Sequence, residues 1–211
     1  MTITEFTIIP FKSPPDFSEP ALHAHFHRLS TWQWECSGFP LLFFKNVDDP
    51  LEVHLATGWA SVEAREAWIR GERNQELLRI FAPYVDMQTL RMVHLGVGFE
   101  AIHRDVDATG GAMVVERYDG TRWEQLASSE SEIFNQSVCS LVGRNLAQDS
   151  GDVYVFRFVG VAEGGEVEVS SVVDPVERWV LKRINHEWGG INHYERSGNY
   201  FLSEIPCDVL S

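Results

Sequence analysis

Residues 52–78 read EVHLATGWASVEAREAWIRGERNQELL, and they place a strand pattern directly before a helix pattern. Apolar and β-branched residues up to Trp59 favour a strand over residues 52–59. Ser61 is a favourable N-cap residue, so we expect a helix from there to about Ala82. The stripe of this helix that is predicted to face inward has helical spacing and comprises Ala64, Trp68, Gly71, Gln75 and Leu78.

The residues around this stretch complete the order βαββαβ. Strands are predicted at 3–11 (ITEFTIIPF), 41–46 and 88–95 (QTLRMVHL), the second of them pairing with 52–59 across Asp48-Asp49-Pro50. Ser18 is predicted to cap a helix that has Pro20 in its first turn and ends at Gly38. The predicted apolar stripe of this helix comprises Leu22, His25, Leu29, Trp32 and Cys36.

The same order of patterns begins again after a link at residues 105–111. The predicted elements are a strand at 112–118, a helix from about Ser128 to Leu146, a hairpin of 153–161 with 166–173, a helix from Asp174 to Trp188 and a strand at 193–202. The last helix is predicted because Asp174-Pro175-Val176-Glu177 combines a capping-box pair with proline at the first helical position. We therefore predict two similar units, residues 1–104 and 112–211.

The segment from Trp59-Ala60-Ser61 to Trp68 resembles the antibiotic-biosynthesis-monooxygenase-like group of dimeric α+β barrel proteins. The resemblance is clearest over residues 40–95. It implies an α+β fold in which two ferredoxin-like βαββαβ units pair their sheets and form a dimeric α+β barrel within one chain. Sheet packing favours the same arrangement, because helices on one face of an antiparallel sheet leave its other apolar face to be covered.

The resemblance also implies a cavity between the sheet and the helices of a unit. We expect His25 or His94 to be the catalytic base there, because an imidazole exchanges protons near neutral pH. Trp32 and Trp68 are predicted to stack on a substrate ring, and Asn74 to stabilise its anion. Further predicted substrate-binding residues are His54, Gly71 and Gln75.

These residues also have a structural interpretation. Inward-facing tryptophan and histidine side chains often belong to a packed core, and Gly71 can simply make room for a strand side chain. Catalysis is favoured if His54 and His94 point to the same side of the sheet as His25, because three imidazoles would then share one cavity. The sequence leaves the direction of the two strand histidines open.

We predict neither a cofactor nor a metal ion. His23 and His27 are four residues apart on a predicted helix, but zinc needs a third ligand and no suitably spaced partner is nearby. Flavin and nicotinamide motifs and a phosphate-binding loop are not found. In the haem-degrading branch of the family that this segment resembles, a histidine follows the helix tryptophan by roughly three turns. Here the matching position, near Leu78, is apolar.

Charge and composition limit the expected partners and location. The chain has 17 Lys and Arg against 31 Asp and Glu, a net charge of −14, which disfavours nucleic acids and anionic membranes. The first ten residues lack a signal-peptide pattern. Cys36, Cys139 and Cys207 are far apart in the sequence, which is typical of a reducing compartment. We therefore expect a cytoplasmic protein.

The leading hypothesis is a cofactor-independent, monooxygenase-like tailoring enzyme that acts with dioxygen on an aromatic or polyketide-type small molecule in secondary metabolism. Two alternatives stay open: an oxygen-independent cyclase, dehydratase or decarboxylase with a histidine base, and a non-catalytic barrel that binds a small molecule. The expected assembly is a monomer with an internal pseudo-dimer, or a homodimer.

Overall fold

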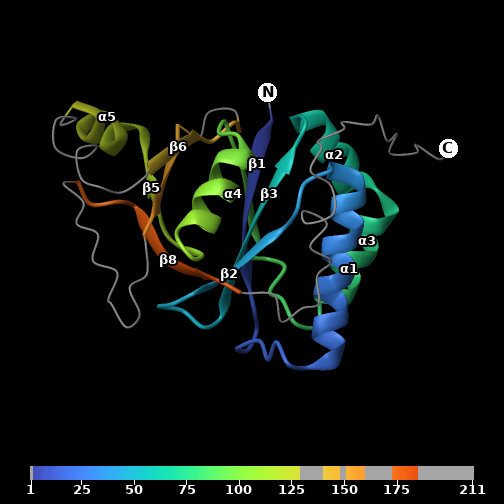
Figure 1. Ribbon diagram of the computed structural model, residues 1–211. Helices are drawn as coiled ribbons and strands as arrows, with labels where there is room; N and C mark the ends of the chain where they lie inside the picture. Colours follow the sequence, from blue (N-terminus) through green and yellow to red (C-terminus); the bar gives the residue numbers. More distant parts are fainter. Residues whose placement is uncertain (1, 129–139, 148–150, 160–172, 185–211) are drawn as a thin grey trace.

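The computed structural model describes residues 2–128, 140–147, 151–159 and 173–184. The strands in these residues form one antiparallel sheet with the order β4-β1-β3-β2-β8-β5-β7-β6 (Figure 1). They are β1 (Ile3–Pro10), β2 (Leu42–Asn46), β3 (Glu52–Trp59), β4 (Arg91–Leu95), β5 (Ala112–Tyr118), β6 (Ser140–Arg144), β7 (Val153–Phe158) and β8 (Glu177–Arg183). The order 4-1-3-2 of the first half returns as 8-5-7-6 in the second, so both halves have the same strand topology.

The two edges of the sheet approach each other and nearly close it into a barrel. The Gly96 amide donates a hydrogen bond to the Arg144 carbonyl oxygen (2.9 Å), and the Leu146 amide donates to the His94 carbonyl oxygen (2.7 Å). These bonds place β4 beside β6, whereas β2 pairs with β8 at the other junction of the two halves. The predicted α+β barrel within one chain is therefore confirmed. The predicted boundaries of the two units at residues 104 and 112 stay a prediction.

The first half has the predicted order of elements. Its helices are α1 (Pro20–Ser37), α2 (Val62–Arg70) and α3 (Glu72–Phe81), which stand together on one side of the sheet (Figure 1). Helix α1 ends at Gly38 as predicted, and this glycine adopts a left-handed φ of 75°. Its predicted N-cap is wrong: Glu19 occupies that position, and the Ser18 hydroxyl instead donates to Asp16 (2.6 Å).

The single helix predicted from Ser61 to Ala82 is wrong, because the helix is interrupted at Gly71 and two helices form instead. This residue has an extended conformation, with φ −69° and ψ 149°, and it separates α2 from α3. The side-chain amides of Asn74 and Gln75 both donate to the Ile69 carbonyl oxygen, over 3.1 and 2.9 Å. They satisfy a carbonyl group that the interrupted helix leaves without a backbone partner. Ser61 caps α2 as predicted, accepting from the Ala64 amide.

The second half keeps the predicted strands β5 and β7 but differs elsewhere. The helix predicted over 128–146 is wrong over its described part, where β6 occupies Ser140–Arg144, and α5 spans Gly120–Ser128; residues 129–139 of the prediction lie outside the described residues. The helix predicted from Asp174 is also wrong over its described part, where β8 runs instead. Its Trp179 and Leu181 side chains alternate into the core with the period of a strand. The strand predicted at 193–202, and that at 166–173 apart from Val173, lie outside the described residues.

The largest core fills the inside of the barrel and is shared by both halves. It joins Phe6 and Phe44 of the first half to Phe156 and Trp179 of the second. Helix α4 (Phe99–Ala108), which occupies much of the predicted link at 105–111, packs Phe99, Ile102 and Val106 into it. A second core lies between the outer face of the first half-sheet and α1, α2 and α3. In the part of the chain that the structure describes, no helix has the length and apolar character required to cross a bilayer.

Candidate functional site

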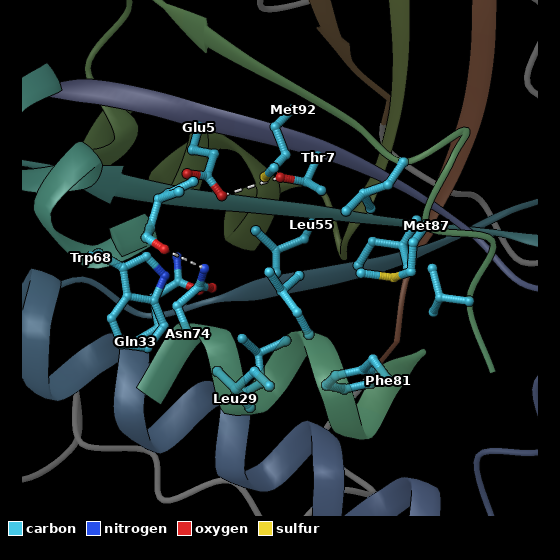
Figure 2. Close-up of a pocket in the computed structure, with 16 residues that line it drawn as sticks. Glu5, Thr7, Leu29, Gln33, Leu55, Trp68, Asn74, Phe81, Met87 and Met92 are labelled. Carbon is cyan, nitrogen blue, oxygen red and sulfur yellow. Dashed lines mark hydrogen bonds between the residues drawn. The ribbon is translucent and has the colours of Figure 1, made fainter. Parts of the chain in front are cut away.

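A cavity of about 90 Å³ lies between the outer face of the first half-sheet and the three helices that cover it (Figure 2). Its walls are mostly apolar and come from β1, β3, β4, all three helices and the segment between α3 and β4. They include Ile9, Leu29, Leu55, Leu77 and Phe81. The position is the one that the family resemblance implied, although the volume is below the ~300 Å³ that is usual for a ligand pocket.

The cavity has two chemically different ends. Figure 2 shows Gln33, Trp68 and Asn74 gathered at one end, and Phe81 and Met87 at the other. The arrangement follows from the path of the chain, because Asn74 lies in the first turn of α3 and Phe81 is its last residue. An elongated molecule would therefore meet amide groups at one end and only apolar groups at the other.

Glu5, which lines the wall near the polar end, belongs to a buried ion pair. Arg65 Nε lies 2.9 Å from Glu5 Oε2, and their side chains are only 10% and 7% exposed. The Thr7 hydroxyl donates to Glu5 Oε1 over 3.2 Å. Both carboxylate oxygens of Glu5 already accept hydrogen bonds from neighbouring side chains. Glu5 is therefore a poor candidate for the catalytic base.

Gln33 is the polar residue whose importance the sequence analysis missed. It is 2% exposed, it lines the cavity, and its Nε2 has no hydrogen-bond partner. The buried residues of α1 are Leu22, Phe26 and Gln33, so the inward stripe is rotated from the predicted one. The spacing Leu22–Phe26–Leu29–Gln33, in steps of four, three and four, is the sequence signal that could have identified it.

His94 lies next to the polar end on the same side of the sheet. It pairs across the strands with Glu5, and its neighbour two residues earlier, Met92, lines the cavity. The His94 Nε2 atom is buried and has no hydrogen-bond partner. Burial, helped by the positive charge of Arg65, lowers the pKa of His94. Its imidazole is therefore neutral at pH 7 and has a nitrogen available to accept a proton.

His54 faces the opposite side of the sheet, so the three imidazoles do not meet. It pairs with Ile8, and its ring contacts Phe6 and Trp179 inside the barrel, at centroid distances of 5.5 and 5.8 Å. Its Nε2 lies 3.2 Å from Glu52 Oε2. Burial is the main reason that the pKa of His54 is lowered.

The other predicted site residues divide into two groups. Trp68 and Asn74 line the cavity, whereas His25, Trp32, Gly71 and Gln75 are not among its lining residues. His25 packs against the rings of Phe81 and Tyr84. Trp32 contacts the guanidinium groups of Arg28 and Arg73. The roles predicted for these residues in binding and catalysis stay predictions.

The cavity does not fit a haem group. Its lining residues include no imidazole, thiol or phenol that could serve as an axial ligand of the usual kind, and Leu78 forms part of the wall. A volume of about 90 Å³ is also far too small for a porphyrin ring. Among the described residues, no group of three or more His, Cys, Asp or Glu side chains is arranged to hold a metal ion.

Comparison with solved structures identifies the fold. A candidate monooxygenase from Fusobacterium nucleatum subsp. nucleatum matches with 8% identity and a TM-score of 0.54, over 87% of this chain and 93% of its own. An anthrone oxidase-like protein matches with 11% identity and a TM-score of 0.54, over 88% and 92%. A candidate chlorite dismutase matches with 7% identity and a TM-score of 0.50, over 88% and 96%.

These matches place the chain in the structural class of dimeric α+β barrel proteins. No family model matches the sequence, and no curated protein does. Because the neighbours share so few residues with this chain and bear names of different activities, they establish the fold alone. The choice of activity must come from the cavity itself.

Proposed function

We propose that this protein is a monooxygenase-like enzyme that oxidises a small aromatic molecule with dioxygen and without a cofactor. The observation that carries the proposal is the polar end of the cavity. There a buried amide, Gln33, lines a mostly apolar space, and a neutral imidazole with an unpartnered nitrogen, His94, lies beside the wall residue Glu5 on the same side of the sheet. The fold shared with a candidate monooxygenase and an anthrone oxidase-like protein supports this class of reaction.

The chemistry begins with removal of a proton. His94 Nε2 takes the hydroxyl proton of a phenol, and the resulting phenolate transfers one electron to dioxygen. The two radicals combine at a ring carbon, and loss of water from the hydroperoxide leaves a quinone carbonyl. One oxygen atom enters the product and the other leaves as water, with all four electrons coming from the substrate. Apolar walls keep bulk water away from the reactive anion.

The volume of the cavity narrows the predicted substrate class. A cavity of roughly 150 Å³ holds one benzene molecule, so about 90 Å³ leaves no room for several fused rings. Met87 and Met92 form part of the wall, and their flexible side chains can move to admit a single ring. We therefore propose a one-ring phenol or quinol, of the kind that occurs in secondary metabolism.

Oxygen consumption by the purified, chelator-treated protein tests this function. We expect uptake with one-ring phenols and quinols above the protein-free rate, and no uptake with the three-ring compound anthrone. His94→Gln should reduce kcat by 10²-fold or more, as expected for loss of a general base. His27→Gln, on the exposed surface of α1, is the matched control and should keep full activity. Uptake that persists in His94→Gln would exclude His94 as the base.

A non-catalytic binding protein is the second candidate, and one observation favours it. No histidine is among the lining residues, and the one lining carboxylate, Glu5, is engaged by Arg65 and Thr7. In that case a one-ring aromatic compound binds, but no oxygen is consumed and no product forms with any member of the panel.

A further inference from the structure

We infer that Gln33 determines the ligand specificity of the cavity and selects one-ring molecules that present a hydrogen-bond acceptor oxygen at one end. The inference rests on the proposed function only in taking this cavity as the binding site. It does not depend on oxygen chemistry. It assigns to Gln33 a role in recognition that neither the sequence pattern nor the related folds indicate.

The energetic position of Gln33 is unusual for a core residue. Its side chain occupies the inward stripe of α1, one turn after Leu29, where an apolar residue would pack without cost. Burying an amide N–H without a partner destabilises a protein, because the group loses its hydrogen bonds to water. A ligand that supplies an acceptor would restore the missing bond.

The neighbouring polar groups indicate that the ligand must bring an acceptor for Gln33. The Thr7 hydroxyl already donates to Glu5, and Arg65 donates to the other oxygen of the same carboxylate. The Asn74 side-chain amide donates to the Ile69 carbonyl oxygen. Among these groups around the polar end, Gln33 Nε2 is the donor that remains without an acceptor.

The shape and the apolar lining of the cavity determine the chemistry of the part of the ligand that lies away from Gln33. The far end, formed by Phe81 and Met87, is apolar (Figure 2). A ring placed between the two ends would contact Leu29 and Leu55 while its substituent points to Gln33. This describes a small aromatic ketone, a phenolate or a quinone, with the oxygen at the Gln33 end.

A matched pair of probes isolates the proposed hydrogen bond. Acetophenone and α-methylstyrene have nearly the same shape, but only the first has an oxygen acceptor. We expect acetophenone to bind the intact protein about tenfold more tightly, as measured by isothermal titration calorimetry, because one hydrogen bond to a buried donor is worth about that factor. In Gln33→Met the two compounds should bind equally.

The variant also has a predicted effect on stability that is independent of any ligand. Gln33→Met removes a buried unpaired amide and keeps the volume, so Tm of the ligand-free protein should rise by about 2–4 °C. Gln88→Met, at an exposed position outside the cavity, is the matched control and should leave both the preference and Tm unchanged. A fall in Tm for Gln33→Met would mean that the amide has a partner, and would overturn the inference.

The outcomes separate this inference from the proposed function. Equal binding of the two probes to the intact protein, or a preference that survives in Gln33→Met, overturns the role of Gln33 even if oxygen is consumed. A preference that depends on Gln33 in a protein that consumes no oxygen upholds the inference and refutes the oxygenase.

Discussion

Glu5 and Arg65 form a buried pair of opposite charges, of which Glu5 lies in the cavity wall. Both side chains are almost fully buried and their closest atoms are 2.9 Å apart. Removing water from two charges is costly, and their attraction recovers that cost only while both are present. The stability of the cavity wall therefore depends on keeping the pair complete.

Replacing one partner should be much worse than replacing both. Arg65→Met leaves an unpaired buried carboxylate, so we expect it to lower the free energy of unfolding by about 3–5 kcal/mol. The double variant Glu5→Met/Arg65→Met should lose far less, because no charge is left behind. Urea unfolding of the single and double variants measures the difference. Equal losses in both proteins would show that the pair contributes through packing alone.

The histidines show which site features a sequence can reveal. His54 and His94 lie in strands that pair with the same strand, β1, yet they face opposite sides of the sheet. Residues 53–59 are all buried on both faces of β3. The alternation of polar and apolar residues that would reveal which way the His54 side chain points is therefore missing. Helical spacing defines one face of a helix and places Trp68 at the cavity, whereas a polar residue weakens that pattern, so Gln33 was missed.

At the scale of elements, glycine positions decide where the helices of the first half end. Gly38 stops α1 with a φ of 75°, a conformation that costs a residue with a Cβ atom roughly 1–2 kcal/mol. Nothing lies within 4 Å of the position where that Cβ would be, so only the backbone conformation opposes a substitution. Asparagine tolerates the left-handed region better than alanine.

These facts predict that alanine at position 38 destabilises the protein more than asparagine does. Gly38→Ala should lower the free energy of unfolding by about 1 kcal/mol, and Gly38→Asn by less than half of that. Both can be measured by urea unfolding monitored by circular dichroism. If alanine and asparagine have the same effect, the end of α1 is not held by the conformation of this glycine.

The strand β8, which the sequence predicts as a helix, shows why that prediction is wrong. Asp174-Pro175-Val176-Glu177 matches a helix start, but the following residues pair with both β2 and β5. Local capping contributes on the order of 1 kcal/mol, whereas a central strand gains two ladders of hydrogen bonds and buries Trp179 and Leu181. Tertiary pairing outweighs local propensity here, and no short window of sequence contains that information.

At the scale of the molecule, the repeated strand order was predictable because each half repeats the same patterns of strands. The barrel core shared by both halves also buries ionisable groups. Burial is the first cause of a lowered pKa for His54 inside the barrel, His94 on the helix-covered face and His103 on α4. Glu52 opposes the shift of His54, and Arg91 adds to it. Acid should therefore weaken the whole barrel.

The sign follows from proton binding. In the unfolded chain these histidines regain an ordinary pKa of about 6.5, so as pH falls below that value the unfolded state binds protons that the folded state excludes. This difference in proton binding leaves the free energy of unfolding unaffected above about pH 6.5 and lowers it below that pH. One fully excluded proton costs at most about 1.4 kcal/mol at pH 5.5, or roughly 3–6 °C in Tm for a chain of this size.

His54 offers the sharpest test, because it is completely buried. His54→Gln keeps a side chain that can donate to Glu52 but cannot titrate near pH 6, so the loss of Tm between pH 7.5 and 5.5 should be smaller than in the intact protein. His27, replaced in the same way at an exposed position of α1, is the control and should leave that loss unchanged. If His54→Gln loses as much Tm as the intact protein, the acid sensitivity arises elsewhere and His54 takes up its proton without unfolding the barrel.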